Sequence, residues 1–330
     1  MTLTRMQEKI IRTLLKTKGG NLDIWQLSRK CGYLSRVIQS VEQLQEMGVV
    51  SAKDSLVRLT NKKLLPRYVV QKETPLKEVM KKFGVFRKEA IFTDNEYDQL
   101  PLLAGAIEHK LSLMLRENDL LNRDIVCLGD DDIFSVACSL SGLPKSITVL
   151  EKDKRVIEFL RKASQKVPVP IKVVQVDLAR PLPERYHNSF DVCVSEPPDT
   201  VRGAFAFLSV GVQGLREGGV LYIGISESAL RNDQWLEMEQ AVTKSGIRFT
   251  DIIQDFEEYA LDGDEQFAWK GFEKLPKWIT KPAQKPWFVS VLLRGELVGA
   301  KNPTHFSLEG IGEDFLTNHL AAYQEELKPL

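Results

Sequence analysis

The sequence predicts an α/β protein in which a doubly wound sheet of seven strands follows a small N-terminal domain. From about residue 111 onward, short continuous apolar runs alternate with helical segments, as in parallel sheets that helices cover on both faces. Before residue 65, apolar residues recur at helical spacing and then alternate as in a hairpin. Hydrophobic residues make up 43% and charged residues 27% of the chain, which excludes a disordered or fibrous protein.

The length of 330 residues predicts two domains, or three small ones. We expect a winged helix-turn-helix-like domain over 1–65, a connector over 66–111 and the main α/β domain over 112–300. The remaining residues, 301–330, form a C-terminal tail that is a candidate flap over a site.

The N-terminal domain is expected to contain three helices and two short strands. The third helix begins at Ser35 as its N-cap and ends at Gly48, and the strands follow at 49–50 and 56–59. Three helices with a two-stranded wing are typical of a winged helix-turn-helix. The pattern predicts fold more firmly than role, because this fold serves both DNA binding and protein association.

The third helix would be the recognition helix of a DNA-binding winged helix. Its exposed face is expected to carry Arg36, Gln39, Ser40 and Gln43. Since Arg36 is the only charged residue on that face, an interaction or dimerisation domain is favoured over DNA binding.

Seven strands and four helices are expected in the main domain. The strands cover 124–128, 146–151, 171–176, 190–195, 219–226, 249–254 and 286–294, and the helices cover 135–141, 154–164, 201–215 and 234–245. In such a sheet the ligand binds beyond the carboxyl ends of the strands.

Charge is divided unevenly along the chain. Of 45 basic and 45 acidic residues, the first 90 positions hold 19 and 8, which leaves 26 and 37 for the rest. An acidic main domain disfavours a nucleic-acid substrate, whose phosphates need Lys and Arg, and favours a cationic one.

No apolar stretch is long enough to cross a bilayer, and the first 20 residues carry basic side chains throughout, unlike a signal peptide. We therefore expect a cytoplasmic protein that does not associate with a membrane. The four cysteines and four histidines show no metal-ligand spacing, so neither a metal site nor a disulfide framework is expected.

An acidic loop follows the first strand of the main domain. Gly129 supplies a tight turn, but Asp130, Asp131 and Asp132 stand where a dinucleotide or S-adenosylmethionine site has further glycines. Three carboxylates would repel a pyrophosphate or the carboxylate of S-adenosylmethionine, so the loop favours a ligand that is cationic at that end. The alternative is a solvated acidic turn.

Acidic residues also end the next two strands. Glu151 lies about 20 residues after the glycine turn, where this kind of fold binds ribose hydroxyls, and Asp153 is the fallback. Asp177 is placed either to accept a hydrogen bond from an adenine amino group or to cap the following segment.

The fourth strand leads into a diproline turn. Pro197 and Pro198 fix the backbone between Glu196 and Asp199 and remove two N–H donors. A rigid turn of carbonyl oxygens can orient an attacking amine, whereas the alternative is an ordinary helix start.

A further acidic stretch, 255–269, interleaves carboxylates with aromatic rings and contains no basic residue. Asp255, Glu257, Glu258 and Tyr259 open it. Carboxylates suit the ammonium groups of a polyamine and rings suit its methylenes, although an acidic surface loop is an equal alternative.

Taken together, these loops and the segment Tyr97-Asp98-Gln99 resemble the branched-chain polyamine synthases, a thermophile-associated family of aminopropyltransferases with a methyltransferase-like (Rossmann-like) fold. The Gly-Asp-Asp-Asp loop is the most specific element. The resemblance implies transfer of aminopropyl groups from decarboxylated S-adenosylmethionine to the internal amine of spermidine, with release of methylthioadenosine. It also implies no cofactor beyond that co-substrate, no metal, and a homodimer.

The residues are assigned accordingly. The internal amine is protonated and must lose a proton before its lone pair can attack, so a carboxylate must act as the base. Asp132 or Asp131 is the expected base, supported by Glu196. The residues expected at the donor are Gly129, Asp130, Glu151, Asp153, Asp177 and Gln99. The residues expected at the polyamine are Asp98, Tyr97, Pro197, Pro198, Asp199, Asp255, Glu257, Glu258 and Tyr259.

Two other functions stay open at this point. The diproline turn and the basic N-terminal region also fit an S-adenosylmethionine-dependent amine or nucleic-acid methyltransferase. The winged helix also fits a polyamine- or nucleoside-sensing DNA-binding regulator.

Overall fold

In the computed structural model, the described residues are 3–71, 74–90, 92, 99–198, 201–226, 232–260, 278, 281 and 284–299. The chain divides into two compact units, which are described separately. The first contains 1–73 and 113–122, and the second contains 74–112 and 123–330. The predicted domain boundaries at 65 and 111 stay a prediction, because compact units need not coincide with domains.

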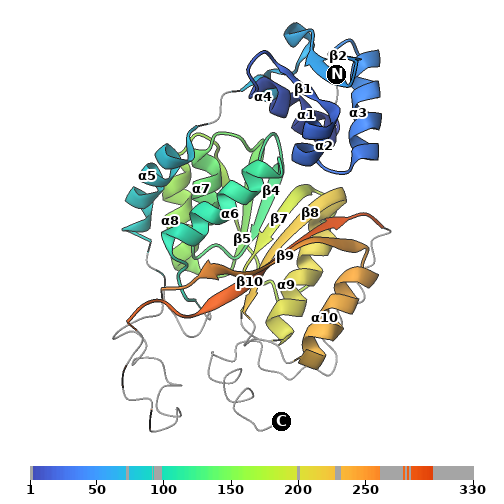
Figure 1. Cartoon of the computed structure of the whole chain (residues 1–330). Coiled ribbons are helices and arrows are strands. Elements are labelled where there is room, and N and C mark those ends of the chain that lie inside the picture. The colour runs from blue at the N-terminus through green and yellow to red at the C-terminus, as the bar shows by residue number, and fades with distance from the viewer. Residues whose placement is uncertain are drawn as a thin grey trace. The chain divides into compact units, whose positions relative to one another are not determined.

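The first unit contains helices and one small sheet (Figure 1). Its elements are α1 (Arg5–Leu15), β1 (Asn21–Asp23), α2 (Ile24–Cys31), α3 (Leu34–Glu46), β2 (Val50–Lys53), β3 (Leu56–Leu59), a short 3-10 turn (Lys62–Leu64) and α4 (Arg67–Val70). The strands pair antiparallel in the order β1-β3-β2. Strand β1 was not predicted, because a three-residue strand among glycines and polar residues carries no clear period.

The start of α3 differs from the prediction. The N-cap is Tyr33, which makes no side-chain cap, and Ser35 lies inside the helix. On the expected recognition face, Ser40 is buried and Gln43 accepts a hydrogen bond from Gln7 at 2.8 Å. The helix therefore uses part of that face for packing within the first unit.

The second unit is built on a seven-stranded sheet, which confirms the predicted α/β class. The strands are β4 (Asp124–Leu128), β5 (Ser146–Glu151), β6 (Ile171–Gln175), β7 (Phe190–Ser195), β8 (Leu215–Ser226), β9 (Ile247–Glu258) and β10 (Val289–Leu297). Their order is β6-β5-β4-β7-β8-β10-β9, and β10 is antiparallel to both of its neighbours. The strands from β6 to β8 are parallel, so their carboxyl ends meet at one edge.

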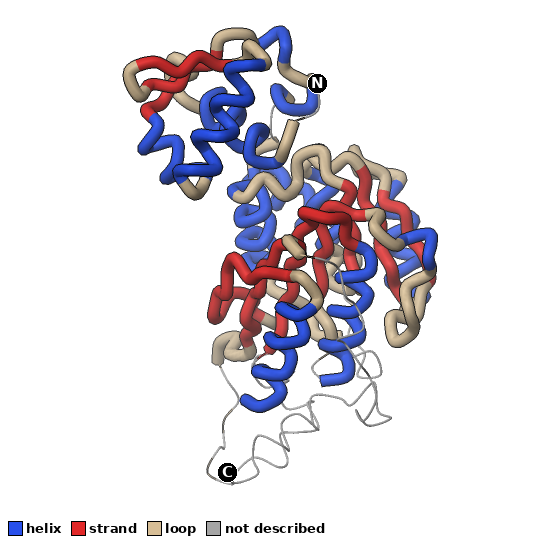
Figure 2. Tube along the Cα trace, turned by 90° about the vertical axis from the view of Figure 1, so that its right-hand side faces the viewer, coloured by secondary structure: helices blue, strands red, loops and turns tan. Residues whose placement is uncertain are grey.

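Helices cover both faces of this sheet (Figures 1 and 2). They are α5 (Leu76–Arg87), α6 (Ala104–Arg116, whose last residues count to the first unit), α7 (Phe134–Leu140), α8 (Lys154–Ser164), α9 (Val201–Gly214) and α10 (Asn232–Lys244). All five residues of β4 are buried, as a central strand between two helical layers requires.

Three strands run further than predicted, and one of them, β10, ends at Leu297 instead of 294. Strand β8 begins at Leu215, which was expected to end a helix, and β9 continues past 254 to Glu258. The continuation of β9 passes through a bulge: Ser290 pairs with Glu257, whereas Leu292 pairs with Ile253. The part of β9 after residue 254 was not predicted, because its acidic residues lack the apolar alternation of a typical strand.

Candidate active site

An acidic hollow lies at the carboxyl ends of β4 and β7. It is lined by Cys127, Leu128, Gly129, Asp130, Asp131, Asp132, Phe134, Val194, Ser195 and Glu196. All three aspartates of the loop and the glutamate of the diproline turn therefore contribute to one concave surface, as the spacing predicted.

The loop after β4 is shaped by backbone conformation. Gly129 has a φ of +68°, which favours glycine, and Ile133 also lies in the left-handed region with a φ of +52°. These two residues turn the chain on both sides of the aspartates before α7 begins. The tight turn predicted at Gly129 is thus present.

Asp130 is a buried structural carboxylate. It accepts hydrogen bonds from the backbone N–H of Ser135, at 3.2 Å, and from the Ser135 hydroxyl. Burial raises the pKa of Asp130 well above its ordinary value. This aspartate fixes the loop to the first turn of α7.

Glu151 holds the acidic loop to the end of β5. Its Oε2 accepts from the backbone N–H of Asp130 at 2.9 Å, and its Oε1 accepts from those of Lys152 at 2.6 Å and Asp153 at 2.8 Å. Burial raises the pKa of Glu151 despite these hydrogen bonds. The predicted contact with ribose stays a prediction, but the residue does lie beside the glycine turn.

Among the carboxylates of the hollow, Asp132 is the one best suited to proton transfer. Its Oδ1 accepts from the backbone N–H of Leu102 at 2.7 Å and lies 3.4 Å from Arg87 Nη1. Burial, followed by the charge of Asp131, raises the pKa of Asp132 to about 7. A carboxylate that titrates near neutral pH can accept and return a proton under ordinary conditions.

Asp131 is less buried than its neighbours and also lines the hollow. Burial raises the pKa of Asp131 well above its ordinary value, and the charges of Glu151 and Glu196 add to that effect. Like charges at such short range favour the protonated forms, so a cation entering the hollow would restore the ionised ones.

A buried lysine joins the diproline turn to β9. Lys110 on α6 has no exposed surface, and its Nζ pairs with Glu196 Oε1 and, at 2.5 Å, with Glu257 Oε1. It also lies 5.2 Å from the ring centroid of Phe134. Burial alone would lower the pKa of Lys110, but the two glutamates raise it, so the side chain is an ammonium.

The bulge in β9 places Glu257 in this cluster. Asp255, inside the bulge, has a φ of +50°, and Glu257 beyond it is completely buried and accepts from Ser290 Oγ at 2.6 Å. Gly224 on β8 leaves the space: a Cβ there would lie 1.8 Å from Glu257 Oε2 and 3.2 Å from Glu196 Cγ. No side chain larger than hydrogen fits at Gly224 without displacing Glu257.

Aromatic rings continue from Glu196. The Tyr259 hydroxyl donates to Glu196 Oε2 at 3.4 Å, and the Tyr259 ring lies 5.2 Å from that of Phe288, which contacts Trp287 at 5.8 Å. Carboxylate and ring surface therefore adjoin, as a polyamine would require.

A second group of predicted residues lies at the start of α8. Asp153 is its N-cap and accepts from the backbone N–H of Arg155 at 2.8 Å, while its Oδ2 binds Arg155 Nη2 at 2.6 Å. Gln99 donates to Asp153 at 3.0 Å and accepts from Arg155 at 3.0 Å. The hydrogen bonds of Arg155 and Gln99 lower the pKa of Asp153 against the effect of burial.

The remaining predicted residues are placed as follows. Asp177 caps the next turn by accepting from Ala179 N–H at 3.1 Å, and lies 3.4 Å from Lys152 Nζ. Pro197 and Pro198 are partly buried.

Asp255 and Glu258 are exposed, and neither lines the acidic hollow. Tyr97, Asp98 and Asp199 lie outside the described residues.

Sequence reasoning missed Lys110 and Arg87. A signal existed for Lys110: it lies on the face of α6 that carries Ile107, Leu111 and Met114, all of them buried. A single lysine on an apolar helix face predicts a buried charge with partners, but those partners lie far along the chain and only the fold identifies them.

Known proteins resemble this chain over most of its length. The family model described as the branched-chain polyamine synthase A C-terminal domain matches residues 78–319. The N(4)-bis(aminopropyl)spermidine synthase of Thermococcus kodakarensis is 30% identical over an alignment of 318 residues, and the match covers 89% of this chain and 89% of the relative. That of Methanocaldococcus jannaschii is 32% identical over 224 residues, which span 66% of this chain and 63% of the relative.

Solved structures agree on the fold. The branched-chain polyamine synthase of Thermus thermophilus, in complex with N4-aminopropylspermidine and 5'-methylthioadenosine, aligns with a TM-score of 0.64 at 22% identity, over 96% of this chain and 92% of that one. A putative RNA methyltransferase of Pyrococcus horikoshii aligns with a TM-score of 0.50 at 16% identity, over 68% of this chain and 99% of that one. From the matched family model and the relatives, the chain belongs to the branched-chain polyamine synthase family.

Proposed function

We propose that the protein transfers aminopropyl groups from decarboxylated S-adenosylmethionine to the internal secondary amine of spermidine. The observation that carries the proposal is the convergence of Asp131, Asp132 and Glu196 on the acidic hollow, in a chain of this family. Both proposed substrates are cations, and the hollow supplies the opposite charge. The products are a branched polyamine and methylthioadenosine.

The donor is distinguished by what it lacks. S-adenosylmethionine carries a carboxylate that Asp131 and Asp132 would repel, whereas the decarboxylated form keeps only its ammonium and sulfonium charges. Gly129, Glu151 and Asp177 at neighbouring strand ends are the proposed contacts of the nucleoside, with Asp130 and Glu151 holding the loop. Gln99 and Asp153 are proposed to border this part of the site.

The acceptor nitrogen must lose a proton before it can attack. We assign proton acceptance to Asp132, because Leu102 fixes its Oδ1 and its pKa is raised to about 7. Asp131 raises that pKa, and Glu196 with Tyr259 is proposed to bind the polyamine chain. Asp98, Tyr97, Asp199 and the diproline turn stay proposed contacts of the polyamine.

The transfer itself is a displacement at carbon. The nitrogen lone pair forms a C–N bond to the carbon beside the sulfonium, and the C–S bond breaks with its electron pair going to sulfur. The first product nitrogen then loses its proton to a carboxylate. A second transfer gives a quaternary nitrogen with no proton to lose, so the carboxylates act there through charge alone.

Product analysis tests this proposal. The purified protein, incubated with decarboxylated S-adenosylmethionine and spermidine, is expected to yield spermidine heavier by one and then two aminopropyl units. Fragmentation in the mass spectrometer should locate both on the internal nitrogen. A linear product, extended at a terminal amine, would contradict the assignment of the acceptor nitrogen.

We also propose that the first unit is a winged-helix domain that serves protein association in a homodimer. In α3, Glu42 and Glu46 are exposed as well as Arg36, and their negative charge disfavours DNA, whereas exposed Tyr33 and Ile38 favour an apolar contact. Light scattering on the full chain should give twice the monomer mass, while binding of duplex DNA at low salt would favour a regulator instead.

Among the described residues, no helix is both long and apolar enough to cross a bilayer. A cytoplasmic location stays a prediction.

A further inference from the structure

We propose that Lys110 is a positioning residue that uses Glu257 as its anchor and holds Glu196 in the geometry required for the acceptor. This inference rests on the proposed function. It gives Glu257 a different role from polyamine contact, because the residue is fully buried and already has two partners.

The geometry makes Glu257 the fixed end of the cluster. Glu257 accepts from Ser290 on the neighbouring strand, and its carboxylate fills the space that Gly224 on β8 leaves for want of a side chain. Lys110 is packed on the apolar face of α6 and beside Phe134, so its Nζ also has little freedom. Because the Glu257 carboxylate and the Lys110 ammonium are both held in place, they give Glu196 a fixed binding partner.

Glu196 is the adjustable end. Its side chain is 18% exposed, unlike the two completely buried partners, and it follows β7 at the entrance to the diproline turn. Lys110 binds Oε1, while Oε2 lies toward the Tyr259 hydroxyl. Lys110 thereby selects which oxygen of Glu196 is left for a polyamine.

A lysine suits this task better than an apolar residue. Two glutamates this close would repel each other, and burial of both without a cation would cost several kcal/mol in general terms. One ammonium between them leaves a single negative charge for the substrate. The cluster therefore attracts a cation without being neutralised by its own lysine.

The charges that face Glu196 come from several elements. Lys110 lies on α6, Glu257 on β9, Tyr259 just after β9, and Asp132 and Asp131 in the acidic loop. Burial raises the pKa of Glu196 well above its ordinary value, Glu257 and Asp132 raise it further, and Lys110 lowers it. Removal of Lys110 or of Glu257 should therefore act on Glu196 in opposite directions.

The test is the pH dependence of kcat/KM for spermidine in K110M and E257Q. In K110M the acidic limb is expected to move to higher pH, because Lys110 lowers the pKa of both Glu196 and Asp132. In E257Q it is expected to move to lower pH, because Glu196 no longer competes for that ammonium. A purely structural role would lower stability in both variants and leave the limb in place, and that result would overturn the proposal.

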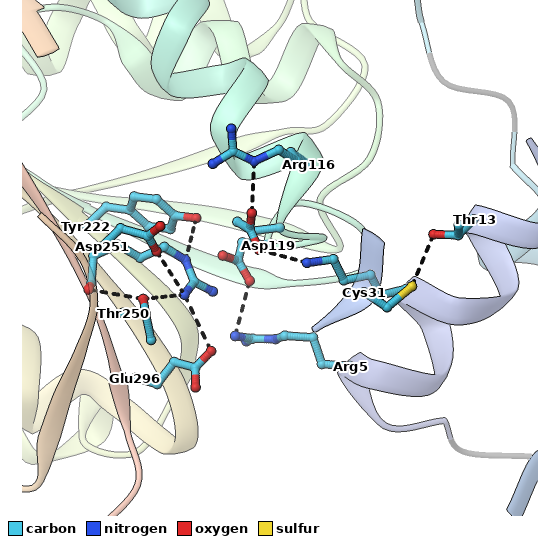
Figure 3. A network of polar contacts seen from close by, with 12 residues as sticks. Arg5, Thr13, Cys31, Arg116, Asp119, Tyr222, Thr250, Asp251 and Glu296 are labelled. Atoms are coloured by element: carbon cyan, nitrogen blue, oxygen red, sulfur yellow. Dashed lines mark hydrogen bonds and ion pairs between the residues drawn. The ribbon is translucent and has the colours of Figure 1, made fainter. Parts of the chain in front are cut away.

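A matched control removes another buried cation. Arg294, which is 4% exposed, binds Tyr222 Oη at 3.0 Å and Thr250 Oγ1 at 2.6 Å, and lies near Asp251 and Glu296; Figure 3 labels these four partners. These partners lie on β8, β9 and β10, and none of them is among the residues that line the acidic hollow. R294M should lose stability without any shift of the limb; a shift equal to that of K110M would overturn the assignment to Lys110.

The pair K110M/E257Q covers the case in which K110M does not fold. It removes both buried charges, so it should recover stability, yet kcat/KM should stay about tenfold or more below wild type because nothing holds Glu196. Full recovery of kcat/KM would contradict the inference. Absence of transfer by the wild-type protein, measured in parallel, would instead contradict the proposed function.

Discussion

At the residue scale, the raised pKa of Asp132 links the function of the site to the stability of the fold. Asp132 is 6% exposed, faces Asp131 and Lys110, and is held by Leu102 and Arg87. Its pKa of about 7 means that folding favours the protonated form. Because the raised pKa belongs to the folded state, ionisation of Asp132 between about pH 4 and 7 costs stability, which is the usual cost of a functional carboxylate.

We therefore expect D132N to abolish turnover and to stabilise the protein. At pH 8 the free energy of unfolding should rise by about 2 kcal/mol, less than three pKa units imply, because the pair with Arg87 is lost. The gain should shrink as the pH falls from 7 to 4. Denaturant titrations at several pH values measure it, and full turnover in D132N would contradict the role of Asp132.

D124N is the control, because it is expected to have the opposite effect on the free energy of unfolding. Hydrogen bonds from Ser146, Arg216 and Lys145 lower the pKa of Asp124 against the effect of burial. A lowered pKa contributes stability above about pH 4 that is lost as the pH falls through the folded-state value. D124N should thus lose stability at pH 8 and keep turnover, since Asp124 lies at the opposite end of β4 from the hollow.

At the scale of elements, two strands and a helix build the buried cluster. The bulge in β9 turns Glu257 inward, β8 provides a glycine where that carboxylate passes, and α6 inserts Lys110. Bulges often occur next to active sites, where they redirect a side chain. The three elements are complementary, so a change in one should disturb the others.

G224A is expected to test that complementarity. A Cβ at 1.8 Å from Glu257 Oε2 must displace the carboxylate and weaken its pair with Lys110. The free energy of unfolding should fall by about 3 kcal/mol, as when a buried ion pair is broken. Thermal or denaturant unfolding measures the loss.

G84A is the matched control for the same substitution. Gly84 lies inside α5, and a Cβ there meets nothing within 4 Å. Alanine should therefore stabilise the helix, by about 0.5–1 kcal/mol. Equal behaviour of G224A and G84A would show that Glu257 has room to move and would contradict the described packing.

At the scale of the whole molecule, opposite charges are concentrated in different regions. The sequence totals cancel, but the acidic hollow gathers four carboxylates that point to cationic ligands. A bound polyamine should stabilise the folded chain in proportion to its occupancy.

Spermidine is expected to raise the melting temperature, and hexylamine much less. At 100 times its Kd, spermidine should add about 2.7 kcal/mol. Because the attraction is between charges, added NaCl should weaken the shift. Differential scanning calorimetry measures it, and equal shifts for the triamine and the monoamine would rule out recognition by several carboxylates.

Much of the fold could be predicted from the sequence, because strands that are buried on both faces are recognised as continuous apolar runs. The ranges 190–195 and 154–164 match β7 and α8. The acidic loop was predicted to be part of a site because three consecutive carboxylates at a strand end are unusual. Its membership in one hollow with Glu196 followed from the parallel order of the strands.

The remainder depended on tertiary contacts. Lys110 pairs with Glu196, which lies 86 positions away, and nothing local specifies that partner. Asp153 and Asp177 act as caps within their own turns, a use that the sequence left as one of two alternatives for Asp177. Strand β9 was predicted too short, because a bulge interrupts the period on which the prediction relied.

The most direct measurement compares two donors with spermidine as acceptor. Purified protein is supplied separately with decarboxylated S-adenosylmethionine and with S-adenosylmethionine, and methylthioadenosine and acceptor mass are followed. We predict aminopropyl transfer with the decarboxylated donor and no reaction with the other. Methyl transfer from S-adenosylmethionine, without aminopropyl transfer, would contradict the central claim that the acidic hollow selects a donor that has lost its carboxylate.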